Sequence, residues 1–124
     1  MPFVRRDEAK EYPLDGMRAI GISAPRTGAA ELTTAVVEFQ PERGIAPHTH
    51  DHEEVLFVVS GRLRLTLGDD EAVLEPGDAA LIPAGTRHHP RADGSEGARF
   101  VSTTVVGTLR IQEDGTSALP PWGD

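Results

Sequence analysis

Residues 47–67 read PHTHDHEEVLFVVSGRLRLTL, and this stretch decides the fold class. From Leu63 to Leu67 every second residue is leucine, and the residues between them are polar. Such an alternation is typical of a β-strand that buries one face and exposes the other to water. A second apolar run, Val55–Val59, precedes it, and Ser60-Gly61 between the two runs predicts a tight hairpin turn.

Outward from this stretch, the whole chain consists of short apolar segments divided by turn residues. Thirteen glycines and ten prolines are spread among 124 residues, and no segment between them carries an apolar stripe at helical spacing. We therefore expect an all-β protein whose eight or so short strands form a sandwich or a small barrel. The expected strands are Met17–Ile22, Leu32–Gln40, Val55–Val59, Arg62–Leu67, Glu71–Glu75, Ala79–Ile82, Arg99–Val106 and Thr108–Gln112.

The length predicts a single domain over residues 1–124, with its barrel core at about residues 30–112. Pro2–Asp15 is expected to form a short lead-in that contains a helical turn. Leu119–Asp124 is expected to form an extended tail that packs against the barrel or a neighbouring subunit. The expected core residues are Val36, Phe39, Leu56, Val58, Leu63, Leu65, Leu81, Ile82, Phe100, Val105 and Ile111.

Composition and charge exclude several classes of function. The chain has 12 Lys and Arg against 20 Asp and Glu, a formal charge of −8, and such a surface repels nucleic acid and anionic membranes. The absence of cysteine excludes disulfides, thiolate zinc sites and a cysteine nucleophile. No apolar run has the length of a signal peptide or a membrane-spanning helix, so we expect a soluble, cytoplasmic protein.

All five histidines lie in two short clusters, and imidazole is the commonest metal ligand in proteins. In an extended chain residues i and i+2 share a face, so His48 and His50 can bind one ion together. Glu54 has the parity of the inward-facing side of the run that follows it, where a carboxylate is costly unless it is paired or bound to metal. The turn Pro83-Ala84-Gly85 can return His88 to the same place, which would complete a site of three histidines and one carboxylate.

Other polar residues near these clusters have simpler interpretations. We expect the chain to turn at Asp51–Glu53, which leaves His52 outside the site or behind it, and we expect His89 to be a surface residue. Glu53 is an alternative carboxylate, one residue out of phase with Glu54. Arg87 and Arg91 flank the second cluster and could bind a substrate carboxylate, although solvated arginines are commoner.

The combination of nitrogen and oxygen ligands limits the identity of the metal. Three imidazoles and one carboxylate suit a divalent transition metal ion, namely Fe, Mn, Ni, Cu, Co or Zn, and disfavour calcium and magnesium. The spacing of the ligands does not choose among these ions.

Two motifs in this region resemble those of the cupin superfamily, which run G-x5-H-x-H-x3,4-E-x6-G and G-x5-P-x-G-x2-H-x3-N. The first is matched from its histidines onward by His48, His50, Glu54 and Gly61, and the second by Gly77, Pro83, Gly85 and His88. Glu42 stands at the position of the leading glycine, with Gly44 two residues later, and Ala92 replaces the closing asparagine. These departures lie outside the ligand set and concern the shape of the loops.

The resemblance implies a small jelly-roll β-barrel, a metal site formed by His48, His50, Glu54 and His88, and a homodimer. It also implies three functions of different classes. The first is a metal-dependent dioxygenase acting on a compact oxygenated organic substrate. The second is a non-redox metal-dependent isomerase, lyase or cyclase of sugar-like or polyketide-like substrates, which basic residues such as Arg62, Arg64 or Arg87 in the pocket would favour. The third is a non-catalytic cupin that binds a small molecule. In the catalytic functions, Glu54 serves either as a metal ligand or as a base.

Overall fold

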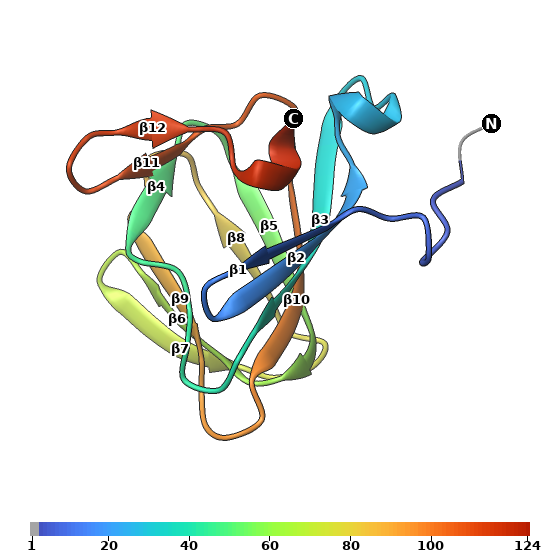
Figure 1. Cartoon of the computed structure of the whole chain (residues 1–124). Coiled ribbons are helices and arrows are strands. Elements are labelled where there is room, and N and C mark those ends of the chain that lie inside the picture. Colours follow the sequence, from blue (N-terminus) through green and yellow to red (C-terminus); the bar gives the residue numbers. More distant parts are fainter. Residues whose placement is uncertain (1–2) are drawn as a thin grey trace.

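The computed structural model of the chain describes residues 3–124, and its regular structure is almost entirely β (Figure 1). Over these residues it has twelve strands and two short 3-10 turns. The strands are β1 (Glu11–Leu14), β2 (Met17–Ser23), β3 (Leu32–Phe39), β4 (His48–His50), β5 (Glu54–Gly61), β6 (Leu63–Leu67), β7 (Asp70–Leu74), β8 (Ala79–Ile82), β9 (His88–Ala92), β10 (Ala98–Val105), β11 (Arg110–Gln112) and β12 (Ser117–Ala118). The 3-10 turns are η1 (Pro25–Thr27) and η2 (Pro121–Gly123).

The strands form two six-stranded antiparallel sheets that face each other around one core (Figure 1). One sheet has the order β1-β2-β3-β10-β5-β8, and the other has the order β12-β11-β4-β9-β6-β7. Within residues 3–124, no ladder joins one sheet to the other, so the molecule is a two-sheet jelly roll rather than a continuously closed barrel. The expectation of an all-β jelly-roll fold is confirmed.

The alternation of apolar residues explains how these strands reach the core. Along β5, Leu56 and Val58 are buried, while the residues between them face outward. Leu63 and Leu65 of β6 pack into the same cluster from the opposite sheet, and Phe100 of the neighbouring strand β10 joins it from the sheet of β5. Burying a side chain of this size contributes roughly 1.5–3 kcal/mol, so the leucine and valine alternation supplies much of the energy that holds the two sheets together.

The expected hairpin at Ser60-Gly61 is wrong. The two runs are both strands, but β5 pairs with β10 and β8, whereas β6 pairs with β7 and β9. The chain crosses from one sheet to the other at this point. Gly61 has φ +71°, and a Cβ atom there would collide with the carbonyl oxygen of Gly97, so this crossing requires glycine.

Four members of the expected core do not lie in it. Leu81 and Val105 are exposed, because their positions on β8 and β10 point away from the opposite sheet. Val36 and Ile111 are only half-buried. In β3 the inward parity belongs to Ala35, Val37 and Phe39, which places Val37 rather than its neighbour in the core.

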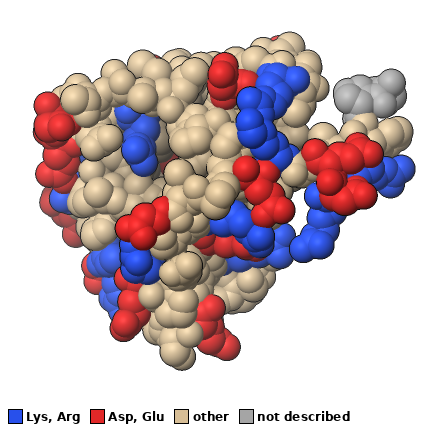
Figure 2. Space-filling model, in the orientation of Figure 1, with Lys and Arg blue, Asp and Glu red and all other residues tan. Residues whose placement is uncertain are grey.

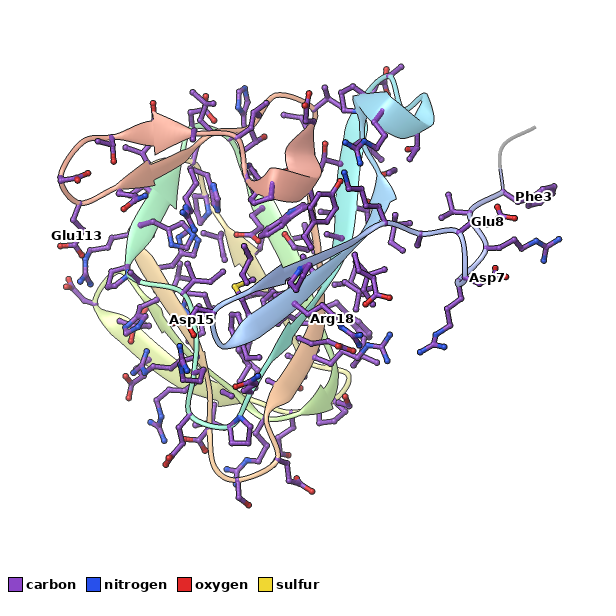
Figure 3. The ribbon with its side chains drawn as sticks, in the orientation of Figure 1. Phe3, Asp7, Glu8, Asp15, Arg18 and Glu113 are labelled. Carbon is purple, nitrogen blue, oxygen red and sulfur yellow. The ribbon has the colours of Figure 1, made fainter. Side chains whose placement is uncertain are left out.

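The two ends of the chain depart in part from expectation. The lead-in contains the expected helical turn, in which the N–H groups of Glu8 and Ala9 donate to the carbonyl oxygen of Arg5, but it continues into the unexpected strand β1. Pro2, the first residue of the expected lead-in, lies outside the described residues. Figure 3 shows Phe3, Asp7 and Glu8 on a segment that extends away from the sheets.

The C-terminal tail packs against the body of the protein, but it is not fully extended. It includes the turn η2, whose Trp122 packs against the core. The backbone N–H of Arg26 donates to the carbonyl oxygen of Asp124 and holds the end of the chain beside η1. Across residues 3–124 we find no helix that combines the length and the apolar character needed to cross a bilayer.

Candidate metal centre

Two neighbouring strands bring the three inward-facing histidines together. β4 pairs with β9 at a single position, where His48 lies opposite His88. Because side chains alternate along a strand, His50 points to the same side as His48, and Thr49 points to the other. Neither β4 nor β9 was among the strands expected from sequence, since each is short and carries few apolar residues.

Each of these histidines is held by one ring nitrogen against a backbone carbonyl oxygen. The Nδ1 atoms of His48, His50 and His88 lie 2.8, 3.0 and 2.9 Å from the carbonyl oxygens of Ala46, Leu109 and Thr86. A carbonyl oxygen only accepts, so Nδ1 carries the hydrogen in all three rings. The tautomer that results leaves a lone pair on Nε2 of the neutral ring, which is the form that binds metal.

The ring nitrogens that remain converge on one point. One ligand atom from each of His48, His50 and His88 lies within 4.8 Å of the other two. The ring centroids of His48 and His88 are 4.2 Å apart. His88 is 1% exposed, and its Nε2 atom is buried without a hydrogen-bond partner.

Glu54 adds a carboxylate to this cluster from the opposite sheet. It is the first residue of β5, it is 7% exposed, and its Oε1 atom lies 3.3 Å from His50 Nε2 and 3.4 Å from His88 Nε2. Its second oxygen accepts a hydrogen bond of 2.6 Å from the hydroxyl of Ser102 on β10. Ser102 therefore turns the carboxylate so that its free oxygen faces the histidines.

This arrangement fits a bound cation. The carboxylate oxygen and the lone pairs of two Nε2 atoms would repel one another at these distances unless positive charge lies among them. A proton can supply part of that charge, but it leaves His88 Nε2 unpartnered, which is costly for a buried polar atom. Three imidazoles and one carboxylate are a donor set that suits divalent transition metals, so the residues present fit the expected ion.

Burial and the carboxylate act on the pKa values of the site in opposite directions. Burial lowers the pKa of His48 to about 4, so this ring is neutral near pH 7. Burial also acts to lower the pKa of His50, but the contact with Glu54 and its charge outweigh burial and raise that pKa. The pKa of Glu54 lies well below its usual range, because the contacts with His50 and His88 outweigh the effect of burial.

The structure brings together His48, His50, Glu54 and His88, while the other candidates lie elsewhere. The chain turns after β4 as expected, and His52 is exposed beside Asp51. Glu53 is exposed. His89 is half-buried on β9, directly opposite Thr66, with a side-chain parity opposite to that of His88.

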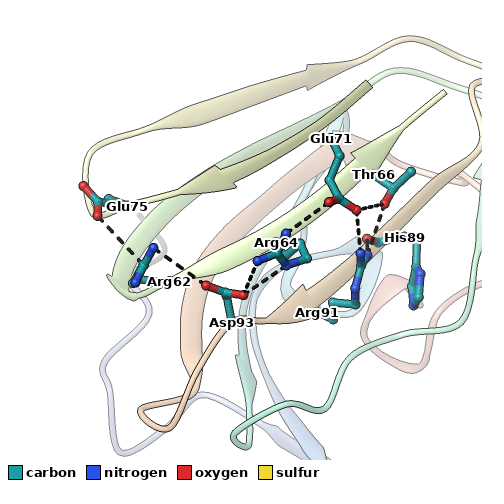
Figure 4. Close-up of polar contacts among 8 residues, drawn as sticks. All are labelled: Arg62, Arg64, Thr66, Glu71, Glu75, His89, Arg91 and Asp93. Atoms are coloured by element: carbon teal, nitrogen blue, oxygen red, sulfur yellow. Dashed lines mark hydrogen bonds and ion pairs between the residues drawn. The ribbon is translucent and has the colours of Figure 1, made fainter. Parts of the chain in front are cut away.

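The four arginines singled out from the sequence, Arg62, Arg64, Arg87 and Arg91, do not line the pocket of the site. Figure 4 shows Arg62, Arg64 and Arg91 in a network of ion pairs with Glu71, Glu75 and Asp93 along β6, β7 and the end of β9. Arg87 pairs with Glu113 at 2.7 Å. Each of these side chains already has a carboxylate partner, so none of them serves as the basic residue of the pocket.

A pocket opens onto the histidines between the two sheets. Figure 2 shows a hollow with the blue atoms of a basic residue at its edge. Apolar and polar residues line the pocket beside the metal-ligand candidates. The apolar ones include Val37, Ile45, Leu56, Pro90, Phe100 and Trp122, and the polar ones include Thr33, Ser102, Thr104, Thr108 and Arg110.

Sequence reasoning missed Ser102 and Arg110 as residues of the site. The parity of Ser102 with Phe100 on the same strand is a signal that could have found the first, because a polar residue at a core-facing position needs a partner. No local pattern marks Arg110, which follows a short loop and precedes a turn.

The cupin domain family matches residues 35–106, which is more than half of the chain. The chain belongs to the cupin family. The matched span contains all four candidate ligands but ends before Arg110.

One relative of this cupin matches most of the chain at moderate sequence identity. Quercetin 2,3-dioxygenase from Bacillus subtilis is 33% identical over 111 residues, which cover 88% of this chain and 33% of the relative. The chain thus spans about a third of the length of that relative.

Two solved structures share the fold at lower identity. The polyketide cyclase RemF from Streptomyces resistomycificus has a TM-score of 0.77 and 23% identity, with 87% of this chain and 81% of the other covered. KdgF from Halomonas sp. has a TM-score of 0.72 and 22% identity, with 84% and 93% covered. At this level of identity, both similarities show the fold alone.

The departures from the cupin motifs have structural explanations. Glu42, at the position of the leading glycine, keeps a left-handed backbone with φ +63°. Gly44 cannot carry a Cβ atom, because it would collide with Pro90 and Arg91 of β9. Ala92, in place of asparagine, faces the core opposite Leu63. The loops therefore keep the shape that β4 and β9 need.

Proposed function

We propose that this cupin is a metal-dependent dioxygenase that holds one divalent transition metal ion through His48, His50, Glu54 and His88 and acts on a compact oxygenated organic substrate. The observation that carries the proposal is the convergence of three Nε2 atoms and one carboxylate oxygen among residues that line one pocket. The 33% identity with a quercetin 2,3-dioxygenase over 88% of the chain supports the choice of reaction class.

The residues around the site have roles that follow from their chemistry. A redox-active ion bound here would supply Lewis acidity and electrons for a reaction between an enolic or catecholic substrate and dioxygen. Glu54 Oε1 is the oxygen that would hold the metal, and Ser102 holds the other oxygen, so Glu54 accepts a proton from a substrate hydroxyl only when Oε1 leaves the ion. Phe100, Leu56 and Val37 exclude water from that side of the pocket and contact the apolar part of the substrate.

A second candidate function is a non-redox isomerase, lyase or cyclase, and one observation favours it. Arg110 and several threonines line the pocket, and these polar groups suit a substrate rich in oxygen. Stabilisation of an enediolate by a Lewis acid requires no electron transfer, so zinc would serve as well as iron.

The first experiment is elemental analysis of untagged protein purified without chelators, beside a His50→Ala variant. The proposal predicts a near-stoichiometric transition metal in the wild type and little in the variant. Absence of metal from both proteins, even after each candidate ion is added back, would overturn it and leave a cupin that binds a small molecule without metal catalysis.

The second experiment separates the two reaction classes. Dioxygen uptake is measured with enolic and catecholic compounds on protein loaded with iron(II), manganese, nickel or copper, and on zinc-loaded protein as a control. Substrate-dependent uptake only with a redox-active ion supports the dioxygenase. Conversion of substrate at equal rates with zinc and without uptake would replace it with the non-redox candidate.

A further inference from the structure

Arg110 lies beside the candidate metal centre because of the register of β11. In the ladder between β11 and β4, Arg110 is the direct partner of His50. Side chains of directly opposed residues in an antiparallel pair project to the same face of the sheet, so Arg110 points toward the interior with His50. It lines the pocket that contains His48, His50, Glu54 and His88.

Arg110 differs from the other half-buried arginines of the described chain. There are five of these, and four have a carboxylate partner: Arg18, Arg64, Arg91 and Arg99. Within residues 3–124, Arg110 makes no ion pair. Removing a guanidinium group from water without a counter-ion is unfavourable, so this position favours an anion that comes from outside the chain.

A second unsatisfied polar group lies in the same pocket. The Oγ1 atom of Thr33 is buried and has no hydrogen-bond partner among residues 3–124, and the residue as a whole is 4% exposed. Thr33 is on β3, in the sheet opposite Arg110, and both residues line the pocket. The pocket therefore offers two donor groups that no residue of the described chain occupies, beside the Nε2 atom of His88 that the metal would take.

The other residues that line the pocket indicate the chemistry of the rest of the ligand. Arg110 is the one Lys or Arg among the pocket residues, and Ile45, Phe100 and Trp122 supply apolar surface. A guanidinium group binds a carboxylate through two parallel hydrogen bonds, which makes it specific as well as strong. The surface of the protein has a formal charge of −8, so attraction of an anion depends on this local group rather than on the overall field.

The geometry points to a substrate class for this site: a small organic acid whose carboxylate pairs with Arg110 and whose apolar body lies on Ile45, Phe100 and Trp122. This inference rests on the proposed function, since it specifies the substrate that the same pocket receives. Arg110 determines specificity by recognising the end of the substrate that does not react, while the four candidate ligands hold the metal.

The inference is tested by a binding experiment that involves no turnover. Trp122 is the one tryptophan of the chain and lines the pocket, so its fluorescence reports on occupancy. Zinc-loaded protein is titrated with benzoate and with 4-methyl-2-oxopentanoate, and in parallel with the methyl ester of each acid. The variants are Arg110→Gln, Arg110→Lys and Arg87→Gln, in which Arg87 is an exposed arginine paired with Glu113.

We expect the wild type to bind at least one acid more tightly than its ester. Arg110→Gln should weaken binding of that acid about tenfold to hundredfold, as for loss of a charged hydrogen bond, and change binding of the ester less than about twofold. Arg110→Lys should recover part of the affinity, and Arg87→Gln should match the wild type.

Three results would overturn the inference: no acid binds to the wild type, each ester binds as tightly as its acid, or Arg110→Gln weakens acid and ester equally. Zinc content is measured in every variant. A normal zinc content with lost acid binding supports Arg110 as the recognition residue whatever the outcome of the dioxygen measurements. Failure of the dioxygenase proposal would instead appear as absent uptake with intact acid binding.

Discussion

His48 and His88 lie directly opposite each other in the ladder between β4 and β9, with their ring centroids 4.2 Å apart. Their Nδ1 atoms face the carbonyl oxygens of Ala46 and Thr86, each two residues earlier in the chain. On both strands, the histidine ring is thus held by the same contact, between its Nδ1 atom and the carbonyl oxygen two residues earlier. The backbone sets the orientation of both rings before any ion binds, which lowers the cost of assembling the site.

The first prediction concerns the contribution of single histidines. Substitution His88→Ala should lower metal occupancy sharply, because it removes a buried donor whose Nε2 atom has no other partner. His52→Ala should leave occupancy nearly unchanged, because His52 is exposed and contacts Asp51. Elemental analysis of the two variants after identical purification measures this. Equal losses in both would mean that the ligand set is wrong.

The second prediction concerns Ser102, whose hydroxyl donates to Glu54 at 2.6 Å. Ser102→Ala should weaken metal binding about tenfold to hundredfold, the usual effect of losing a group that orients a ligand. Competition with a chelator of known affinity gives the dissociation constant. Thr103→Ala, on the opposite face of the same strand, is the matched control and should bind metal like the wild type. A Ser102→Ala variant with unchanged affinity would show that Glu54 needs no positioning.

The third prediction concerns the proton on His50. Since the contact with Glu54 and its charge raise the pKa of His50 despite burial, the metal-free site keeps a proton on this ring to a higher pH than a free imidazole would. Metal must displace that proton, so affinity should rise by about tenfold per pH unit below the raised pKa and level off above it. Calorimetric titration in two buffers of different ionisation enthalpy counts the protons released.

The raised pKa of His50 also affects the stability of the metal-free protein. A pKa that is higher in the folded state stabilises the folded protein below the unfolded value, and this contribution is lost as the pH rises through the folded pKa. His50 should therefore stabilise the metal-free protein at pH 6 and cease to do so at alkaline pH. Zero proton release on metal binding at pH 6.5 would contradict both expectations.

The fourth prediction concerns the backbone of Glu42, the one residue other than glycine with positive φ in the described chain. The left-handed conformation costs a residue with a Cβ atom about 1 kcal/mol or more. Glu42→Gly should therefore raise the free energy of unfolding, by up to about 1 kcal/mol, with part of the gain offset by the greater freedom of the unfolded chain. Denaturant unfolding measures the change.

A matched substitution separates backbone strain from the loss of a negative charge. Glu31 is exposed and does not have positive φ, so Glu31→Gly removes the same charge without relieving strain. It should leave stability unchanged or lower it by up to roughly 1 kcal/mol. Equal effects of the two substitutions would assign the result to charge.

Much of the candidate site could be predicted because its signals are local. The spacing of His48 and His50 and the parity of Glu54 with Leu56 follow from the period of a strand, which two or three residues already define. The exposure of His52 follows from the turn after β4. Whether the four residues bind metal stays a prediction.

The expectations from sequence are wrong where the pairing of strands decides the position of a residue. Ser60-Gly61 has the sequence of a hairpin, but β5 pairs with β10 and β8 and β6 pairs with β7 and β9, so the two strands join different sheets. Leu81 is apolar and was expected in the core, yet its register on β8 turns it outward. A local pattern does not encode which strand lies beside which.

The all-β class, the types of candidate metal ligand and their approximate positions follow from the sequence alone, because alternation and ligand chemistry are properties of neighbouring residues. The fold was needed to show that Ser102 contacts Glu54 across 48 positions and that His50 lies against the Leu109 carbonyl across 59. It also decided that Arg110, rather than Arg87 or Arg91, lines the pocket. These relations depend on the register between distant strands, which is set when the two sheets pack around a common core.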